Sequence, residues 1–323
     1  MRPLILALSL LASLATAAAA QAPGWMRAAW PETDFSRTAI DLGEVISGGP
    51  PRDGIPALSD PAFIPVAAET RLADREPVLS LEIGGEARAY PIRYLMWHEI
   101  ANDTVAGAPV AVTFCPLCNS AVVFDRRLAG ETLEFGVSGL LRHSDMIMYD
   151  RQGFSWWQQF TGEAIVGAAT GQRLAPLPSL MESWAAFRDR NPDGRVMAAP
   201  TGWRRSYGRN PYEGYDSGAW PFLYQGETPP HGIAPLARVL RVGARAWPLS
   251  RIAAAGGLTE AGLRITWAEG QASALDAARI GDGREVGDIT VTDAATGAPV
   301  THEVVFAFAF HAFHPDGAWM LGK

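Results

Sequence analysis

Short β-prone runs bounded by glycine and proline are the feature that most limits what this chain can fold into. The run "PVLSLEIGGEARAYPI" (Pro77 to Ile92) predicts two strands joined by a tight turn at Gly84-Gly85. The 323 residues include 33 Gly and 24 Pro, which favours many turns over long helices. We therefore expect a mixed α+β fold dominated by β-structure.

A later stretch echoes this hairpin. Val78 to Ile92 resembles Val239 to Leu249, with Ala87 to Pro91 in line with Ala244 to Pro248. We therefore expect two related β-rich halves, and chance similarity between two hairpins is the alternative.

The echo extends to the two cysteines. Laying "AVTFCPLCNSA" (111–121) over "RITWAEGQASA" (264–274) places Cys115 on Ala268 and Cys118 on Gln271. If the echo is a true repeat, the second copy keeps the scaffold and lacks the thiols. The cysteines would then be an addition to a scaffold that folds without them.

The expected organisation has five parts. They are a signal peptide (1–20), a lead-in segment (21–52), a first β-rich half with the cysteines (53–165), a helix and long-loop insertion (166–235) and a second β-rich half (236–323). Apolar side chains at helical spacing between Ile92 and Ile100 predict a short helix before the cysteines. In the insertion, Ser179 and Glu182 match a capping box and predict a helix that ends before Asn191.

The N-terminus has the pattern of a secretory signal. Arg2 precedes an apolar run over 4–14, and small residues over 17–20 offer a cleavage site near Ala20/Gln21. The apolar run is shorter than the roughly 18 residues that a membrane span needs. We expect an exported, most simply periplasmic, protein with no membrane span in the mature chain.

Charge and motif content exclude several function classes. The formal net charge is −7 and Lys and Arg do not cluster, so no nucleic-acid partner is expected. The chain contains no G-x-S-x-G motif, phosphate-cradling loop or dinucleotide fingerprint, so we expect no nucleotide or flavin cofactor. An envelope protein or a small ligand is the expected partner.

The only two cysteines lie in "VAVTFCPLCNSAVVFD" (110–125). A thioredoxin-like redox motif would continue into a helix, whereas "SAVVFD" is β-prone. Strand, C-P-x-C turn and strand are typical of a metal-binding knuckle, in which Pro116 fixes φ and Asn119 tolerates a left-handed turn. Three interpretations stay open: a metal site, a reversible dithiol for envelope redox chemistry, and a local structural disulfide.

Two thiolates fill only half of a tetrahedral site, so a metal needs further ligands. His98 is the first candidate because it closely precedes the cysteine strand and lies off the apolar stripe of its predicted helix. Zinc would suit histidine ligands, and cuprous copper would suit Met or His. Weaker candidates are His143, Asp145, Met146 and Met148, followed by His311 and His314.

Several motifs occur together in a family-like order. They include "WHEIANDT", "VAVTFCPLCNSAVVFDRR", "FGVSGLLRHSDMIMYDRQ", "SWWQQFTGEAIVG" and "GRNPYEGYDS". The chain resembles, over Gly54 to Asp316, the bacterial and archaeal family catalogued as a domain of unknown function, DUF 3179. The resemblance implies an exported or envelope-associated protein with a C-P-x-C element, and it implies no activity.

Overall fold

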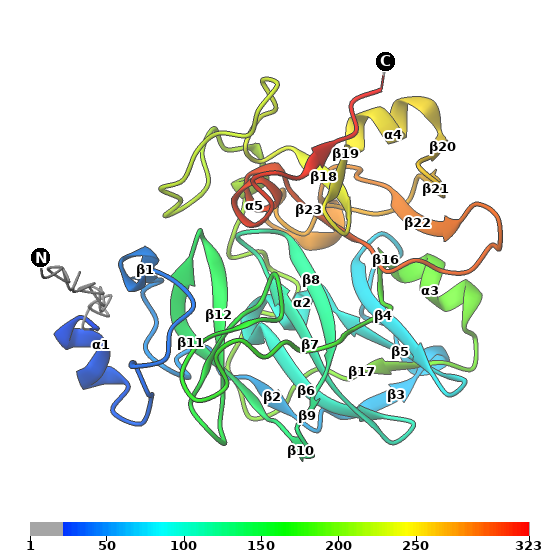
Figure 1. The fold of residues 1–323 in the computed structure, drawn as a ribbon. Coiled ribbons are helices and arrows are strands. Elements are labelled where there is room, and N and C mark those ends of the chain that lie inside the picture. The colour runs from blue at the N-terminus through cyan, green and yellow to red at the C-terminus, as the bar shows by residue number, and fades with distance from the viewer. Residues whose placement is uncertain (1–21, 323) are drawn as a thin grey trace, which may run out of the picture.

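The chain folds into small sheets connected by short helices and loops (Figure 1). A computed structural model describes residues 22–322, so the expected signal peptide lies outside the described residues. Three sheets have five strands, one has four, one has three, and one is a two-stranded hairpin. The prediction of a β-dominated fold is confirmed. Within 22–322, no helix is both long enough and apolar enough to cross a membrane.

The N-terminal sheet has the order β1-β11-β12-β13-β14. Its strands are β1 (Val45–Ser47), β11 (Phe135–Arg142), β12 (Asp145–Asp150), β13 (Trp156–Gln158) and β14 (Ala164–Val166). The lead-in residues supply α1 (Gly24–Ala29) and the 3-10 turn Leu42–Glu44, and they bury Met26 and Trp30 against this sheet.

The sheet that carries the cysteines has the order β15-β8-β7-β6-β2. Its strands are β2 (Leu58–Ser59), β6 (Ile100–Val105), β7 (Ala108–Cys115), β8 (Ser120–Asp125) and β15 (Pro176–Leu177). The hairpin of β9 (Arg127–Leu128) and β10 (Glu131–Thr132) follows β8. Strands β7 and β8 are buried almost throughout, as expected for an apolar run without polar alternation.

The predicted hairpin forms the centre of a third sheet with the order β16-β4-β5-β17-β3. Its strands are β3 (Phe63–Pro65), β4 (Pro77–Ile83), β5 (Glu86–Pro91), β16 (Leu180–Ser183) and β17 (Arg195–Met197). Ile83 pairs with Glu86, and Gly84 and Gly85 have φ of 57° and 79°. Both central positions are left-handed, which confirms the predicted two-residue turn.

Two short helices border this third sheet. Helix α2 (Ile92–His98) follows β5 and confirms the predicted helix, with Ile92, Leu95 and Met96 buried. Helix α3 (Trp184–Arg190) begins later than predicted, because Leu180–Ser183 pairs with β4 as a strand. Ser183, rather than Ser179, caps this helix by accepting a hydrogen bond from the Ala186 N–H.

The C-terminal part forms a four-stranded and a three-stranded sheet, ordered β23-β18-β19-β24 and β20-β21-β22. Its elements are β18 (Arg238–Val242), β19 (Arg245–Pro248), α4 (Leu249–Ala255), β20 (Gly257–Glu260), β21 (Leu263–Ala268), β22 (Asp288–Asp293), β23 (Glu303–Phe306), α5 (Ala307–Phe313) and β24 (Ala318–Trp319). The remaining 3-10 turns are Val66–Ala68, Tyr215–Ser217 and Ile280–Asp282.

Elements of the two halves follow the same order along the chain. The series β18, β19, α4, β20, β21 matches the series β4, β5, α2, β6, β7. The sheet orders β16-β4-β5-β17 and β23-β18-β19-β24 also match, and in both the last pair alone is parallel. Pro91 pairs with Val78 as Pro248 pairs with Val239, so the register agrees with the sequence echo.

The two halves share one large core. It contains α2, β7 and β8 from the first half and most of β23 and α5 from the second. The Phe306 N–H donates to the carbonyl of Cys118 (2.9 Å). The cysteine turn therefore lies where the C-terminal segment packs on the first half.

Candidate functional site: two thiols and a buried carboxylate

The cysteines lie at a tight turn between two paired strands. Cys115 ends β7 and pairs with Ser120 at the start of β8. Asn119 has φ of 51°, and its N–H donates to the Pro116 carbonyl (3.2 Å). The Asn119 Nδ2 donates to the Val304 carbonyl (2.7 Å), which ties the turn to the C-terminal part. The predicted strand–turn–strand arrangement is confirmed, and both cysteines are free and buried.

A carboxylate lies beside the two sulfurs. Ligand atoms of Cys115, Cys118 and Asp145 all lie within 4.8 Å of one another, and the three residues are buried. Asp145 is the first residue of β12, and the turn before it has left-handed φ at His143 (52°) and Ser144 (61°). The Ser144 carbonyl lies 3.4 Å from the Cys118 Sγ, so this turn contacts the thiol directly.

Only one oxygen of Asp145 is satisfied by the protein. Its Oδ2 accepts hydrogen bonds from the Gln158 Nε2 (2.6 Å) and the Phe160 N–H (3.0 Å). Its Oδ1 is buried and accepts no hydrogen bond from an N–H or O–H group, so the neighbouring thiols are the only donors beside it in the described residues. A buried carboxylate oxygen without a partner is costly, and a carboxylate fixed through its other oxygen is typical of an oriented metal ligand.

Burial disfavours negative charge throughout this site. Desolvation raises the pKa of the Cys115 thiol, and it raises the pKa of the Cys118 thiol well above the ordinary value. It also raises the pKa of Asp145 to about 6. Within 22–322, neither Asp145 nor the neighbouring Glu99 forms an ion pair with a basic side chain. The site thus gathers acidic groups without a protein cation to balance them.

Glu99 is a fourth acid, and it adopts an unusual backbone conformation. It ends α2 with φ of 58° and ψ of −33°, and it is 8 % exposed. Desolvation and the charge of Asp145 raise its pKa to about 8. The matching end of α4 carries Gly256, with φ of 66°. Left-handed φ is strained for glutamate and free for glycine.

The structure does not bring the predicted ligand His98 into this group. Its Nδ1 lies 2.7 Å from the Pro56 carbonyl, and its Nε2 lies 2.7 Å from the Tyr207 hydroxyl. Both ring nitrogens therefore have protein partners. Among the weaker histidine and carboxylate candidates, Asp145 is the one that lies beside the sulfurs within residues 22–322.

The other candidates lie in different surroundings. His143 lies 3.6 Å from a Glu44 carboxylate oxygen and packs edge-on against Phe313. Met146 and Met148 are buried in the large core. His311 lies in α5, and His314 caps that helix beside the rings of Phe160 and Phe310.

Two hollows differ in how they lie relative to the thiol site. The first has a volume of about 200 Å³, and Glu99, Leu117, Met146, Tyr212 and Phe222 are among its lining residues. Cys115, Cys118 and Asp145 do not line it, and it adjoins the thiol site through their chain neighbours Leu117 and Met146.

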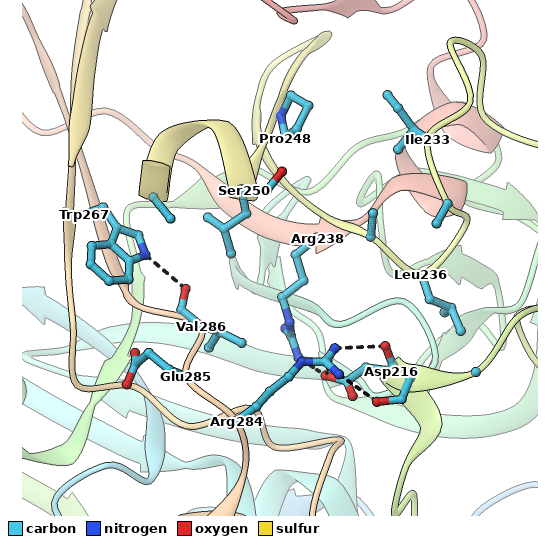
Figure 2. A pocket seen from close by; sticks show the side chains of 16 residues that line it. Asp216, Ile233, Leu236, Arg238, Pro248, Ser250, Trp267, Arg284, Glu285 and Val286 are labelled. Atoms are coloured by element: carbon cyan, nitrogen blue, oxygen red, sulfur yellow. Dashed lines mark hydrogen bonds and ion pairs between the residues drawn. The ribbon is translucent and has the colours of Figure 1, made fainter. Parts of the chain in front are cut away.

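The second hollow, of about 600 Å³, lies in the C-terminal part (Figure 2). At its base the Arg238 and Arg284 guanidinium groups lie 2.9 and 3.0 Å from the Asp216 Oδ2. No residue of the thiol site lines it. Arg238 and Arg284 share the Asp216 carboxylate, and the lining Glu285 pairs with Arg75, so each charged lining group has an ion-pair partner, unlike Glu99.

Comparison with known proteins gives a family and no activity. The family model described as "Protein of unknown function (DUF3179)" matches residues 52–317. No curated protein and no solved structure matches the chain.

Proposed function

We propose that this chain, which belongs to the DUF3179 family, is an exported protein that binds a metal ion through Cys115, Cys118 and Asp145. The observation that carries the proposal is the state of Asp145. One oxygen is held by two hydrogen bonds, and the other is buried, unpartnered and beside two free thiols. A cation bound there would satisfy the orphaned oxygen.

The electrostatics support a cation for a second reason. Three groups that lose a proton to become anions meet at a place where residues 22–322 supply no basic partner. Burying them costs free energy, and a divalent ion would repay it by stabilising the thiolate and carboxylate forms. Binding would therefore release protons and weaken as the pH falls.

Zinc is the first choice of metal. Two thiolates and one carboxylate combine soft and hard ligands, which suits borderline zinc better than cuprous copper. Three protein ligands also leave one tetrahedral position open. Open positions are typical of zinc sites that bind a water or a substrate, whereas structural zinc sites have four protein ligands.

The redox alternative has less support. A thiol that exchanges disulfides needs an accessible thiolate, which positive surroundings or a helix N-terminus stabilise. Cys115 is 2 % exposed and Cys118 is fully buried, and burial, together with the nearby Asp145, raises the pKa of both thiols. A structural disulfide has less support still, because the thiols are free.

We also propose that the two halves are copies of one unit and that only the first acquired the site. The shared element order and the shared hairpin register support this. Thr113 faces Ile100 as Thr266 faces Gly257, which places Cys115 level with Ala268. Glu99 and Gly256 likewise both end the helix of their unit. The acidic side chains are then additions to a scaffold that folds without them.

Zinc affinity, measured by competition with a chromophoric chelator, tests the ligand set. We expect Asp145→Asn to weaken zinc binding at least tenfold, and His98→Ala to leave the affinity within about threefold of the parent. Asp125→Asn is the matched control, because Asp125 lies on the sheet that carries the cysteines but pairs with Arg127. Unchanged zinc affinity in Asp145→Asn would contradict the assignment of Asp145 as the third ligand. A large loss of zinc affinity in His98→Ala would favour His98 as a ligand instead.

A further inference from the structure

The hollow beside Glu99 has the make-up of a small-molecule chamber. Its volume is about 200 Å³. An apolar protein cavity of roughly 150 Å³ accommodates benzene, so this space admits a molecule of that size with a small substituent. Apart from Glu99 and Tyr212, its walls are apolar side chains and glycine or proline. An apolar pocket with few polar groups is typical of a site for a small organic ligand.

Glu99 is the acidic group in the chamber, and it lacks a protein partner. The side chain is more than nine-tenths buried, and within 22–322 no hydrogen bond reaches its carboxyl group. Its backbone groups, in contrast, are satisfied: the N–H donates to the Leu95 carbonyl and the carbonyl accepts from the Phe114 N–H. A buried polar side chain without a partner is costly, so a ligand is its natural complement.

The wall opposite is built by a specific backbone feature. Strand β11 changes register between Val137 and Leu140, and Gly139 lies in the bulge with φ of 76°. A Cβ at Gly139 would lie 2.0 Å from the Pro50 carbonyl oxygen. The lead-in segment therefore packs on the bulge closely enough to exclude any larger residue, and it lines the chamber with Gly48 and Pro50.

The chamber lies close to the protein surface. Phe222, one of its lining residues, is 54 % exposed, and its carbonyl accepts a hydrogen bond from the Ser144 hydroxyl next to Asp145. The same loop thus covers both the chamber and the thiol site.

We infer that the chamber binds a small uncharged molecule that has an apolar body and one oxygen acceptor, with the Glu99 carboxyl group as the donor to that oxygen. This inference rests on the proposed metal function, because the bound molecule would lie beside the open coordination position as a ligand or substrate. A charged ligand is disfavoured, because the chamber offers no basic group and borders the acidic thiol site.

Acetophenone and ethylbenzene form a matched probe pair, because they share size and shape and differ in the carbonyl oxygen. Binding is followed at pH 6 through the ¹³C-labelled methyl group of Met146, which lines the chamber; Met146→Leu assigns the resonance. We expect acetophenone to bind at least tenfold more tightly than ethylbenzene. In Glu99→Leu the two affinities should agree within about twofold.

Two further variants locate the binding. Val137→Phe should weaken both probes at least tenfold by filling the space, and the milder Val137→Leu should weaken both by a smaller factor if the larger residue prevents folding. Equal affinities in the parent, no binding of either probe, or full binding in both Val137 variants would overturn the inference.

Each titration is run on zinc-treated and on chelator-treated protein. A protein that binds no zinc but still prefers acetophenone to ethylbenzene would overturn the proposed metal function and support the chamber. A protein that binds zinc but does not distinguish the two probes would overturn the chamber and support the metal function.

Discussion

Replacing Glu99 by glutamine should change the pH dependence of stability in the metal-free protein. Burial raises the pKa of Glu99 from 4.5 to about 8. Below pH 4.5 the carboxyl is neutral in both the folded and the unfolded chain, so its contribution to stability is fully present. Between pH 4.5 and about 8 the unfolded chain ionises while the folded chain stays neutral, so stability falls.

The size of this loss follows from the pKa difference. At about 1.4 kcal/mol per pH unit, the interval from 4.5 to about 8 corresponds to roughly 5 kcal/mol. Glutamine is neutral at every pH and similar in shape. We therefore expect Glu99→Gln to match the parent near pH 4.5 and to exceed its stability by several kcal/mol at pH 8.

Urea unfolding with a chelator present, at pH 5, 6, 7 and 8, measures the effect. Glu131→Gln, on the exposed β9–β10 hairpin, is the control and should stay within about 0.5 kcal/mol of the parent at each pH. Parallel pH profiles for Glu99→Gln and the parent would refute the argument that Glu99 is buried and neutral.

Three further predictions follow from other contacts. Asn119→Val should destabilise the protein by about 1–3 kcal/mol in urea unfolding, because a β-branched residue is strained at φ of 51°, whereas Asn119→Gly should keep the turn; equal stabilities would contradict the left-handed conformation. Asp216→Ala should cost about 3–5 kcal/mol in the same assay, because it leaves the buried Arg238 without its partner, and a loss below 1 kcal/mol would contradict the buried pair. Zinc at one hundred times its dissociation constant should stabilise the parent by about 2.7 kcal/mol and not Cys115→Ser/Cys118→Ser; equal shifts in thermal unfolding would place the zinc elsewhere.

Local sequence patterns predicted the elements that local chemistry determines. Two adjacent glycines defined the turn of the β4–β5 hairpin, and the β-prone residues after Cys118 identified strand β8 in place of a redox-active helix. Both features depend on backbone preferences within a few residues. The pattern at Ser179 failed, because pairing of Leu180–Ser183 with β4 overrode the local helix signal.

The composition of the site depended on contacts that are distant in sequence. His98 seemed a suitable ligand because it precedes the cysteine strand, yet its partners Pro56 and Tyr207 are 42 and 109 residues away. Asp145 lies beside the sulfurs because of the left-handed turn at His143 and Ser144. Neither turn residue is a glycine, so the sequence does not indicate this turn. Glu99 carries no local sign of burial, and only comparison with Gly256 shows that glutamate is an unusual choice there.

The content of metal and of free thiols in the chain over 21–323 is the most direct test of the proposed metal site. The parent chain over 21–323 and Cys115→Ser/Cys118→Ser are purified without chelator and measured by elemental analysis and by thiol titration under denaturing conditions. The account predicts about one zinc per parent chain, none in the double variant, and two free thiols in the parent once the metal is removed. A parent chain without metal that does not take up zinc or copper, with thiols that oxidise and reduce reversibly, would contradict the metal site and favour redox exchange.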